Sequence, residues 1–114
     1  MSTSNRQERG TSFQVTATHA TSAVASKTGA TNTKYYITNI AGSSDKAGSL
    51  LLVKDGTTVI WQVQLATTAA GINAFEQAFT QPLECTTGNL ASVTVDGTSA
   101  CYANILGFSL PAIS

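Results

Sequence analysis

Charge is scarce in this sequence, and neither sign is in excess. Lys, Arg, Asp and Glu make up 11% of the 114 residues, with six basic side chains against six acidic ones, whereas a typical globular domain is about 25% charged. Binding of nucleic acid by phosphate neutralisation needs a basic patch, and electrostatic docking on a membrane needs a polybasic segment. The composition therefore predicts neither nucleic acid nor a membrane as a partner. A near-zero net charge favours association with other protein.

Side chains that carry catalysis or bind metals are also few. His19 is the only histidine, and a nucleophilic hydroxyl or thiol needs a base beside it. The two cysteines match no zinc or redox spacing, and neither a G-x-S-x-G turn nor a glycine-rich phosphate loop occurs. The carboxylates left for acid–base chemistry are Asp45, Asp55, Glu76, Glu84 and Asp96. Two of these precede a glycine in a turn, where Asp is favoured for its conformation. We expect no catalytic site, no metal and no cofactor.

Long apolar runs are missing as well. No stretch approaches the roughly 18 apolar residues of a membrane-spanning helix, and the polar segment Met1–Gly10 does not resemble a secretory signal. We therefore expect a protein that is made and folded in a cytoplasm, where Cys85 and Cys101 would be reduced. A disulfide would require the two to face each other on neighbouring strands, which the sequence leaves open.

Short segments of alternating or apolar character recur along the chain. We predict strands at 13–18, 22–27, 34–41, 49–54, 57–65, 90–95 and 101–110. Asp55-Gly56 separates two of them, and Asp-Gly in that position predicts a tight hairpin with positive φ at both central residues. Asp96-Gly97 starts a second hairpin loop, which Thr98 and Ser99 close. The segment 72–79 fits either a helical spacing or an edge strand, and Pro82–Cys85 is a short extended piece. About eight strands with closely spaced turns predict an all-β fold, an antiparallel, jelly-roll-like β-sandwich.

Alternation within the strands assigns side chains to faces. From 59 to 65 the odd-numbered residues share one face, and we expect Trp61 at the centre of the core. Tyr102 shares a face with every second residue of the last strand, which we expect to be a core face. Tyr35 and Tyr36 are adjacent and must point to opposite sides of their strand. One of the two is therefore expected to be exposed, or to be buried against another chain.

Residues 1–12 lack periodicity and large apolar side chains, and they predict a polar N-terminal arm ahead of a β-sandwich domain of residues 13–114. Such a terminus is ordered only when something holds it. We expect the arm to lie along a neighbouring subunit; the alternative is that it folds back on its own domain. The residues predicted as partner contacts are Arg6, Arg9, Phe13 and Tyr35.

Several short motifs carry a family resemblance. They are Lys34-Tyr35-Tyr36-Ile37-Thr38-Asn39-Ile40, Gly42-Ser43-Ser44-Asp45, Leu52-Val53-Lys54-Asp55-Gly56-Thr57-Thr58-Val59-Ile60-Trp61, Pro82-Leu83, Thr87-Gly88-Asn89-Leu90, Ala103-Asn104-Ile105 with Gly107-Phe108, and upstream Ala17-Thr18-His19-Ala20. On these motifs, the segment from Lys34 to Phe108 resembles a group of small bacteriophage jelly-roll virion proteins, which includes capsid decoration (cement) proteins.

The resemblance implies a structural protein and brings no catalytic residues with it. The function it implies is a decoration protein that binds and stabilises the shell of the major capsid protein, as a dimer or trimer on the capsid surface of a virion assembled in the host cytoplasm. The alternative is a tail or receptor-binding module that grips host glycans, which an exposed Tyr35 or Tyr36 beside Asp or Asn in a groove would favour. A small hydrolase is a third hypothesis, for which the sequence offers no pair of base and nucleophile.

Overall fold

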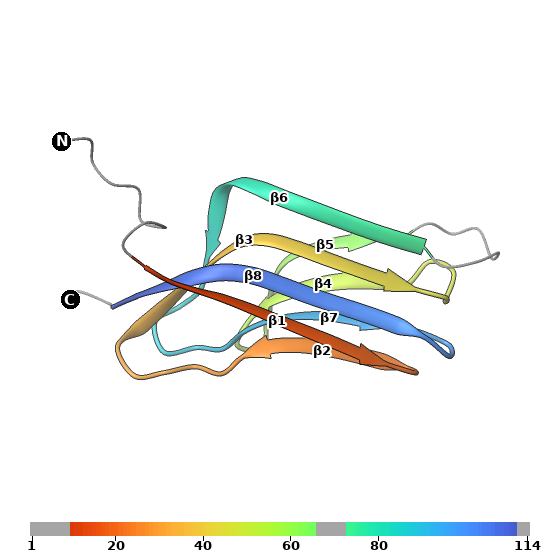
Figure 1. Ribbon diagram of the computed structural model, residues 1–114, viewed down its shortest axis with the longest axis horizontal. Helices are drawn as coiled ribbons and strands as arrows, with labels where there is room; N and C mark the ends of the chain where they lie inside the picture. Colours follow the sequence, from red (N-terminus) through yellow and green to blue (C-terminus); the bar gives the residue numbers. More distant parts are fainter. Residues whose placement is uncertain (1–9, 66–72, 112–114) are drawn as a thin grey trace.

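The computed structural model describes residues 10–65 and 73–111, in which all regular secondary structure is β-strand. The strands are β1 (Thr11–His19), β2 (Ser22–Lys27), β3 (Thr33–Ser44), β4 (Leu50–Asp55), β5 (Thr58–Gln64), β6 (Asn73–Glu84), β7 (Ala91–Asp96) and β8 (Cys101–Pro111). They run along the long axis of the molecule (Figure 1). The all-β prediction is confirmed, and residues 73–79 of the ambiguous segment belong to the long strand β6.

The strands form two four-stranded antiparallel sheets. Sheet I has the order β1-β8-β3-β6 and sheet II the order β2-β7-β4-β5. The chain passes from one sheet to the other at every connection except the β4–β5 hairpin. Two interleaved Greek keys in this order make a jelly roll, so the predicted β-sandwich is confirmed.

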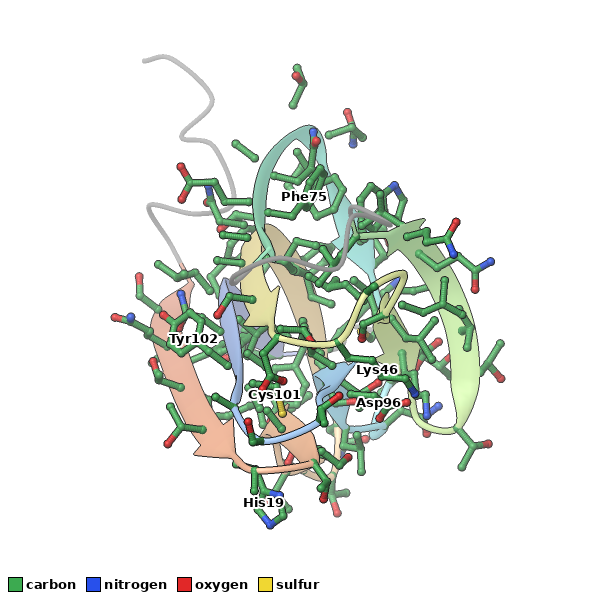
Figure 2. All side chains as sticks on the ribbon, turned by 90° about the vertical axis from the view of Figure 1, so that its right-hand side faces the viewer. His19, Lys46, Phe75, Asp96, Cys101 and Tyr102 are labelled. Carbon is green, nitrogen blue, oxygen red and sulfur yellow. The ribbon has the colours of Figure 1, made fainter. Side chains whose placement is uncertain are left out.

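The core lies between the inner faces of the two sheets. Its largest fully buried apolar side chains on sheets I and II are Ile37, Ile40, Ile105, Leu51, Val53, Val93 and Val95. Toward β1 and β2 the inner positions hold small residues such as Ala23, Ala25 and Ala103, which allow the sheets to approach each other. Toward β5 and β6 larger aromatic side chains pack against this core, among them Phe75 (Figure 2).

Trp61 belongs to this aromatic side and not to the centre of the core. Its ring stacks on Phe75 with centroids 6.1 Å apart and meets Phe79 edge-on at 5.4 Å. The prediction of a central Trp61 is wrong because β5 is the edge strand of sheet II. Its ring instead links the edges of the two sheets, since both phenylalanines lie on β6, the edge strand of sheet I.

A β-bulge interrupts the alternation of β5. Val53 pairs with Trp61 and Lys54 pairs with Val59, so Ile60 is an extra residue on the β5 side. A bulge of this kind shifts the following side chains by one position relative to the partner strand. Ile60 consequently packs against the core, and Val59, predicted on the core face, is 42% exposed.

The turn predictions are partly correct. The β4–β5 hairpin exists, but Asp55 pairs with Thr58, so the two loop residues are Gly56 and Thr57. Of these only Gly56 has a positive φ, 63°, which fits a hairpin turn with glycine at the first central position. Asp96-Gly97 does not close a hairpin, because β7 and β8 lie in different sheets. It begins a crossover between them.

Strand β3 extends farther than the sequence indicates. The predicted strand ends before Gly42, in front of a polar loop, whereas β3 continues to Ser44. Ser43 pairs with Tyr102 on β8 and with Ala74 on β6. Pairing on both sides of a central strand outweighs the weak strand propensity of glycine and serine. The extension places Ser43 on the outer face of sheet I.

Candidate functional site

Two of the four predicted partner contacts are described, and both lie at the interior. Tyr35 faces sheet II, is 3% exposed, and its hydroxyl donates to the Thr28 carbonyl oxygen at 2.6 Å. Phe13 packs edge-on against its ring at a centroid distance of 5.4 Å. These two aromatic side chains therefore pack within the chain. Arg6 and Arg9 lie outside the described residues.

Tyr36 points to the outer face of sheet I but is also covered. It is 6% exposed, and its ring stacks on Phe108 with centroids 4.9 Å apart and an interplanar angle of 9°. Nearby, the Lys34 ammonium pairs with the Glu84 carboxylate at 2.7 Å. Neither adjacent tyrosine is therefore exposed, contrary to the expectation for a strand with one solvent-facing side.

His19 is placed at the turn that joins β1 to β2. Its Nδ1 atom accepts hydrogen bonds from the backbone amides of Thr21 at 3.1 Å and Ser22 at 3.2 Å, so the proton of the neutral imidazole belongs on Nε2. The Cys101 thiol donates to the backbone carbonyl of His19 at 3.2 Å and not to its ring. The contacts of the imidazole thus stabilise a tight turn.

Cys85 and Cys101 lie near opposite ends of the sandwich. The Cys85 amide donates to the carbonyl of Tyr35 at 2.9 Å, near the start of β3, while Cys101 pairs with Ser44 at its end. Those partners are nine positions apart along β3, or about 30 Å, so the two thiols cannot form a disulfide within one chain. Both are free and buried. Burial raises the pKa of Cys85 to about 12 and raises the pKa of Cys101 as well.

Asp45 ties the β3–β4 loop to the β7–β8 crossover. Its carboxylate accepts the Ser99 hydroxyl, the Thr98 amide at 2.8 Å and the Ser99 amide at 2.9 Å. Its own amide donates to the Ala100 carbonyl at 3.1 Å. The Ser99 hydroxyl and the Thr98 amide hold the pKa of Asp45 below its usual range, because hydrogen bonds to the charged form favour it.

Asp55 makes an equivalent clamp at the other end of the sandwich. Its carboxylate accepts the Thr86 amide at 2.9 Å, the Thr86 hydroxyl at 2.8 Å and the Asn89 side-chain amide at 3.0 Å. The β4–β5 hairpin is thereby fixed to the loop that precedes β7. Two of the candidate acid–base carboxylates therefore serve to fasten loops.

In residues 10–65 and 73–111, no three His, Cys, Asp or Glu side chains come together as a metal-binding group. The same part of the chain contains no helix with the length and hydropathy of a transmembrane segment.

The outer face of sheet I carries a shallow trough, which we call the outer groove. It consists of three open hollows of about 370, 430 and 450 Å³. The first and second share Ser43 and Tyr102, and the second and third share Ala41 and Glu76. The outward-facing residues that line it on β1, β3, β6 and β8 are Thr18, Asn39, Ala41, Ser43, Ala74, Glu76, Ala78, Tyr102, Asn104 and Leu106.

Short side chains on β3 and β6 form the floor of the outer groove. The register places Ala41 between Asn104 and Glu76, and Ser43 between Tyr102 and Ala74. Tyr102 was predicted to face the core but lies on the outside of sheet I, as Figure 2 shows, while Cys101 lies between the sheets. The alternation of β8 was predicted correctly, but the inner face was assigned to the wrong set of residues.

Asn104 is held in one orientation at this surface. It is 7% exposed, and its side-chain oxygen accepts the Thr16 hydroxyl at 2.8 Å and the Gln14 amide at 3.3 Å. Both donors come from β1. The amide nitrogen of Asn104 is therefore turned away from β1, toward the part of the outer groove that lies over β3 and β6.

The outer face of sheet II, the second candidate surface, is weakly charged and partly apolar. Val24 is 50% exposed, Leu50 44% and Val59 42%. The register aligns Val24, Thr94, Leu52 and Gln62 in one row across all four strands. Lys54 and Asp96 are the charged side chains that the register assigns to the described part of this face. We call this surface the sheet II face.

No protein-family model matches the chain, and no curated protein sequence matches it. Among solved structures, it is similar to a chain in the virus-like particle of the extra small virus of the giant freshwater prawn Macrobrachium rosenbergii, with 14% identity over 85% of this chain and 77% of that chain and a TM-score of 0.37. It is also similar to 13% of latent PorU from Porphyromonas gingivalis, with 8% identity over 86% of this chain and a TM-score of 0.43.

A third similar structure is the insecticidal crystal protein Cry2Aa, with 12% identity over 79% of this chain and 16% of that chain and a TM-score of 0.38. The chain thus spans only a small part of PorU and Cry2Aa. Jelly rolls serve many unrelated functions, so similarities with such low sequence identities and TM-scores indicate no role for this chain.

Proposed function

We propose that this protein is a capsid decoration protein of a bacteriophage, which docks on the major capsid protein through the sheet II face. The observation that carries the proposal is the exposure of Val24, Leu50 and Val59 on a face with little charge. The solvated side of an antiparallel sheet is usually polar, and the centres of protein interfaces are depleted of charged residues. The composition of this face therefore favours a protein partner.

The size of the face indicates how it would bind. Its four strands, each six or seven residues long, cover about 20 by 20 Å, or roughly 400 Å² in projection. A stable interface takes about 800 Å² from each partner. Side chains make the accessible area of a face larger than its projection, but one sheet II face still lies at the lower end of a standard interface. This favours binding as a dimer or trimer, because linked copies multiply a weak contact.

The N-terminal arm belongs to the same proposal. We expect it to extend the contact along a neighbouring subunit, with Arg6 and Arg9 among the contacting residues. Because β1 begins at Thr11, deleting residues 2–9 leaves all eight strands in place. If the arm contributes, shells mixed with the deletion variant hold fewer copies of the protein; equal occupancy would remove the arm from the proposal.

Binding of this kind stabilises a shell by mass action. A protein that binds assembled capsid and not free subunits shifts the equilibrium toward the assembled state, by an amount that grows with its concentration and affinity. The clamps at Asp45 and Asp55 fix loops at both ends of the sandwich, so little order has to be gained on docking. Rigid partners lose less conformational entropy when they bind.

The test is co-sedimentation with empty shells of the phage that encodes the protein. Val24→Lys and Leu50→Lys place a charge in the sheet II face, and we expect each to lower shell affinity by at least about tenfold, as for residues central to an interface. Thr80→Lys is the matched control, because it adds the same charge at an exposed position on β6, an edge strand of the opposite sheet, outside the outer groove. The proposal fails if the wild-type protein does not bind shells, or if both variants bind as well as the control.

The alternative hypothesis, a tail module that binds host glycans, lacks the feature that would favour it. An exposed Tyr35 or Tyr36 in a groove would favour that hypothesis, and both side chains are buried.

A further inference from the structure

We propose that the outer groove is a binding site for neutral glycans, separate from the sheet II face. This inference goes beyond the proposed function, since it concerns the opposite side of the sandwich. A protein docked through sheet II presents sheet I to the surroundings. The groove on sheet I is then free to bind polysaccharide on a cell or in the medium.

The shape of the groove suits a short chain of rings. Its three hollows are joined through shared lining residues, and each has a volume in the roughly 300–1,000 Å³ range of ligand sites. Between Asn39 and Ser43 the floor follows β3 for about 13 Å. The small side chains of Ala41, Ser43 and Ala74 keep this floor low between taller neighbours.

Tyr102 supplies an aromatic surface at the junction of two hollows. It lines both the first and the second, and it is only partly buried. The face of an aromatic ring is apolar and carries partial negative charge. The C–H groups on one side of a sugar ring carry partial positive charge, so they pack favourably against such a face.

Polar groups for hydroxyl recognition lie farther along the groove. Glu76 lines the second and third hollows and offers carboxylate oxygens as acceptors. The amide nitrogen of Asn104, turned away from β1 by the bonds from Thr16 and Gln14, offers donors. Asn39 adds a second amide in the third hollow. Fixed donors and acceptors beside an aromatic ring match a ligand rich in hydroxyl groups.

Charge and backbone geometry disfavour other ligand classes over the floor of the groove. No Lys or Arg lines any of the three hollows in the described part of the chain, and the carboxylate of Glu76 repels anions. Nucleic acid and acidic glycans are therefore disfavoured. An extended peptide gains most of its affinity by pairing with a free strand edge. The backbone of β3 under the groove is already paired with β6 and β8.

The experiment is an NMR titration of the full-length protein labelled with nitrogen-15. The probes are short neutral oligosaccharides of glucose, galactose, mannose and N-acetylglucosamine, with a sialylated oligosaccharide and an unstructured peptide for comparison. We expect at least one neutral probe to shift amide resonances of β3, β6 and β8 next to the groove. Tyr102→Ala should weaken that binding by at least about tenfold, because it removes the stacking surface.

A second variant guards against loss of folding. Ala41→Gln raises the floor of the groove without removing any side chain from the core, and we expect it to weaken binding as Tyr102→Ala does. Ser26→Gln, on the exposed outer side of β2, is the matched control and should bind like the wild type.

The inference is overturned if no neutral probe shifts groove resonances at millimolar concentration, if only the sialylated probe or the peptide binds, or if both groove variants bind like the control. Shell binding is measured on the same variants. Groove variants that still occupy shells, and Val24→Lys protein that still binds glycan, show that the two proposals stand or fall separately.

Discussion

Ile105 and Leu106 are neighbours on β8, and the register predicts different costs for shortening them. Ile105 faces sheet II and is fully buried, with Val15 and Ile40 beside it on the adjacent strands. Leu106 faces outward, partly buried in the outer groove. Replacement by Ala removes three carbons from either side chain, worth about 2.4 kcal/mol of transfer free energy at ~0.8 kcal/mol per methylene. The difference lies in what surrounds the space that is left.

In the closed core, the cavity left by the Ile105 side chain adds a further cost to the lost transfer free energy. We therefore expect Ile105→Ala to lower the free energy of unfolding by about 3–4 kcal/mol. Leu106→Ala opens onto water and leaves no closed cavity, so we expect a loss of about 1 kcal/mol. A domain of 114 residues has an unfolding entropy of about 0.24 kcal/mol per kelvin, so Ile105→Ala should lower Tm by about 12–17 °C.

Both variants are measured by calorimetry and by urea titration at neutral pH. The ranking tests the register itself, because a slip of one residue exchanges the inner and outer faces of a strand. Equal losses, or a larger loss for Leu106→Ala, would refute the arrangement in which Tyr102, Asn104 and Leu106 line the outer groove.

Three further predictions concern the clamp, the thiols and one close approach. Hydrogen bonds lower the pKa of Asp45 in the folded state. The carboxylate therefore stabilises the fold fully at pH values above the unfolded-state pKa of about 3.9, and this stabilisation is lost as the pH falls below that value. In the wild type the urea midpoint should fall between neutral pH and pH ~3, and Asp45→Asn should make this fall smaller. Cys85 and Cys101 should react with a thiol reagent only after denaturation and should show no intrachain disulfide by mass spectrometry. Gly107→Ala should cost about 1–3 kcal/mol in the same urea titration, because the new Cβ would fall 2.2 Å from the Tyr36 carbonyl oxygen.

The sequence predicts the strands well because period-two alternation and turn residues are local signals. β2 coincides with the predicted 22–27, and the β4–β5 hairpin follows from Asp55-Gly56. The bulge at Ile60 was not predictable, since an extra residue in one strand depends on the partner strand. The edge position of Trp61 depends on strand order, which alternation does not encode.

The candidate sites were harder to predict than the strands for a related reason. Alternation divides β8 into two sets, but it does not say which set faces the core. The set with Tyr102 and Phe108, which we expected to face the core, has the bulkier side chains, whereas the inner set holds Cys101, Ala103 and Ile105. Sheet packing explains the outcome, because small inner residues let sheet II approach. The outer groove forms because the larger side chains of β8 face outward beside the short side chain of Ala41 on β3.

Leu50 supports a docking role for the sheet II face more strongly than Val24 or Val59 does. Valine is favoured in strands for its branched side chain, so an exposed valine can be explained by β-propensity alone. Leucine has no such advantage, and Leu50 leaves 44% of its surface in water. The inner side of β4 is already filled by Leu51 and Val53, so the fold gains little from an apolar residue at position 50. A partner that covers the sheet II face gives this side chain a role that folding does not.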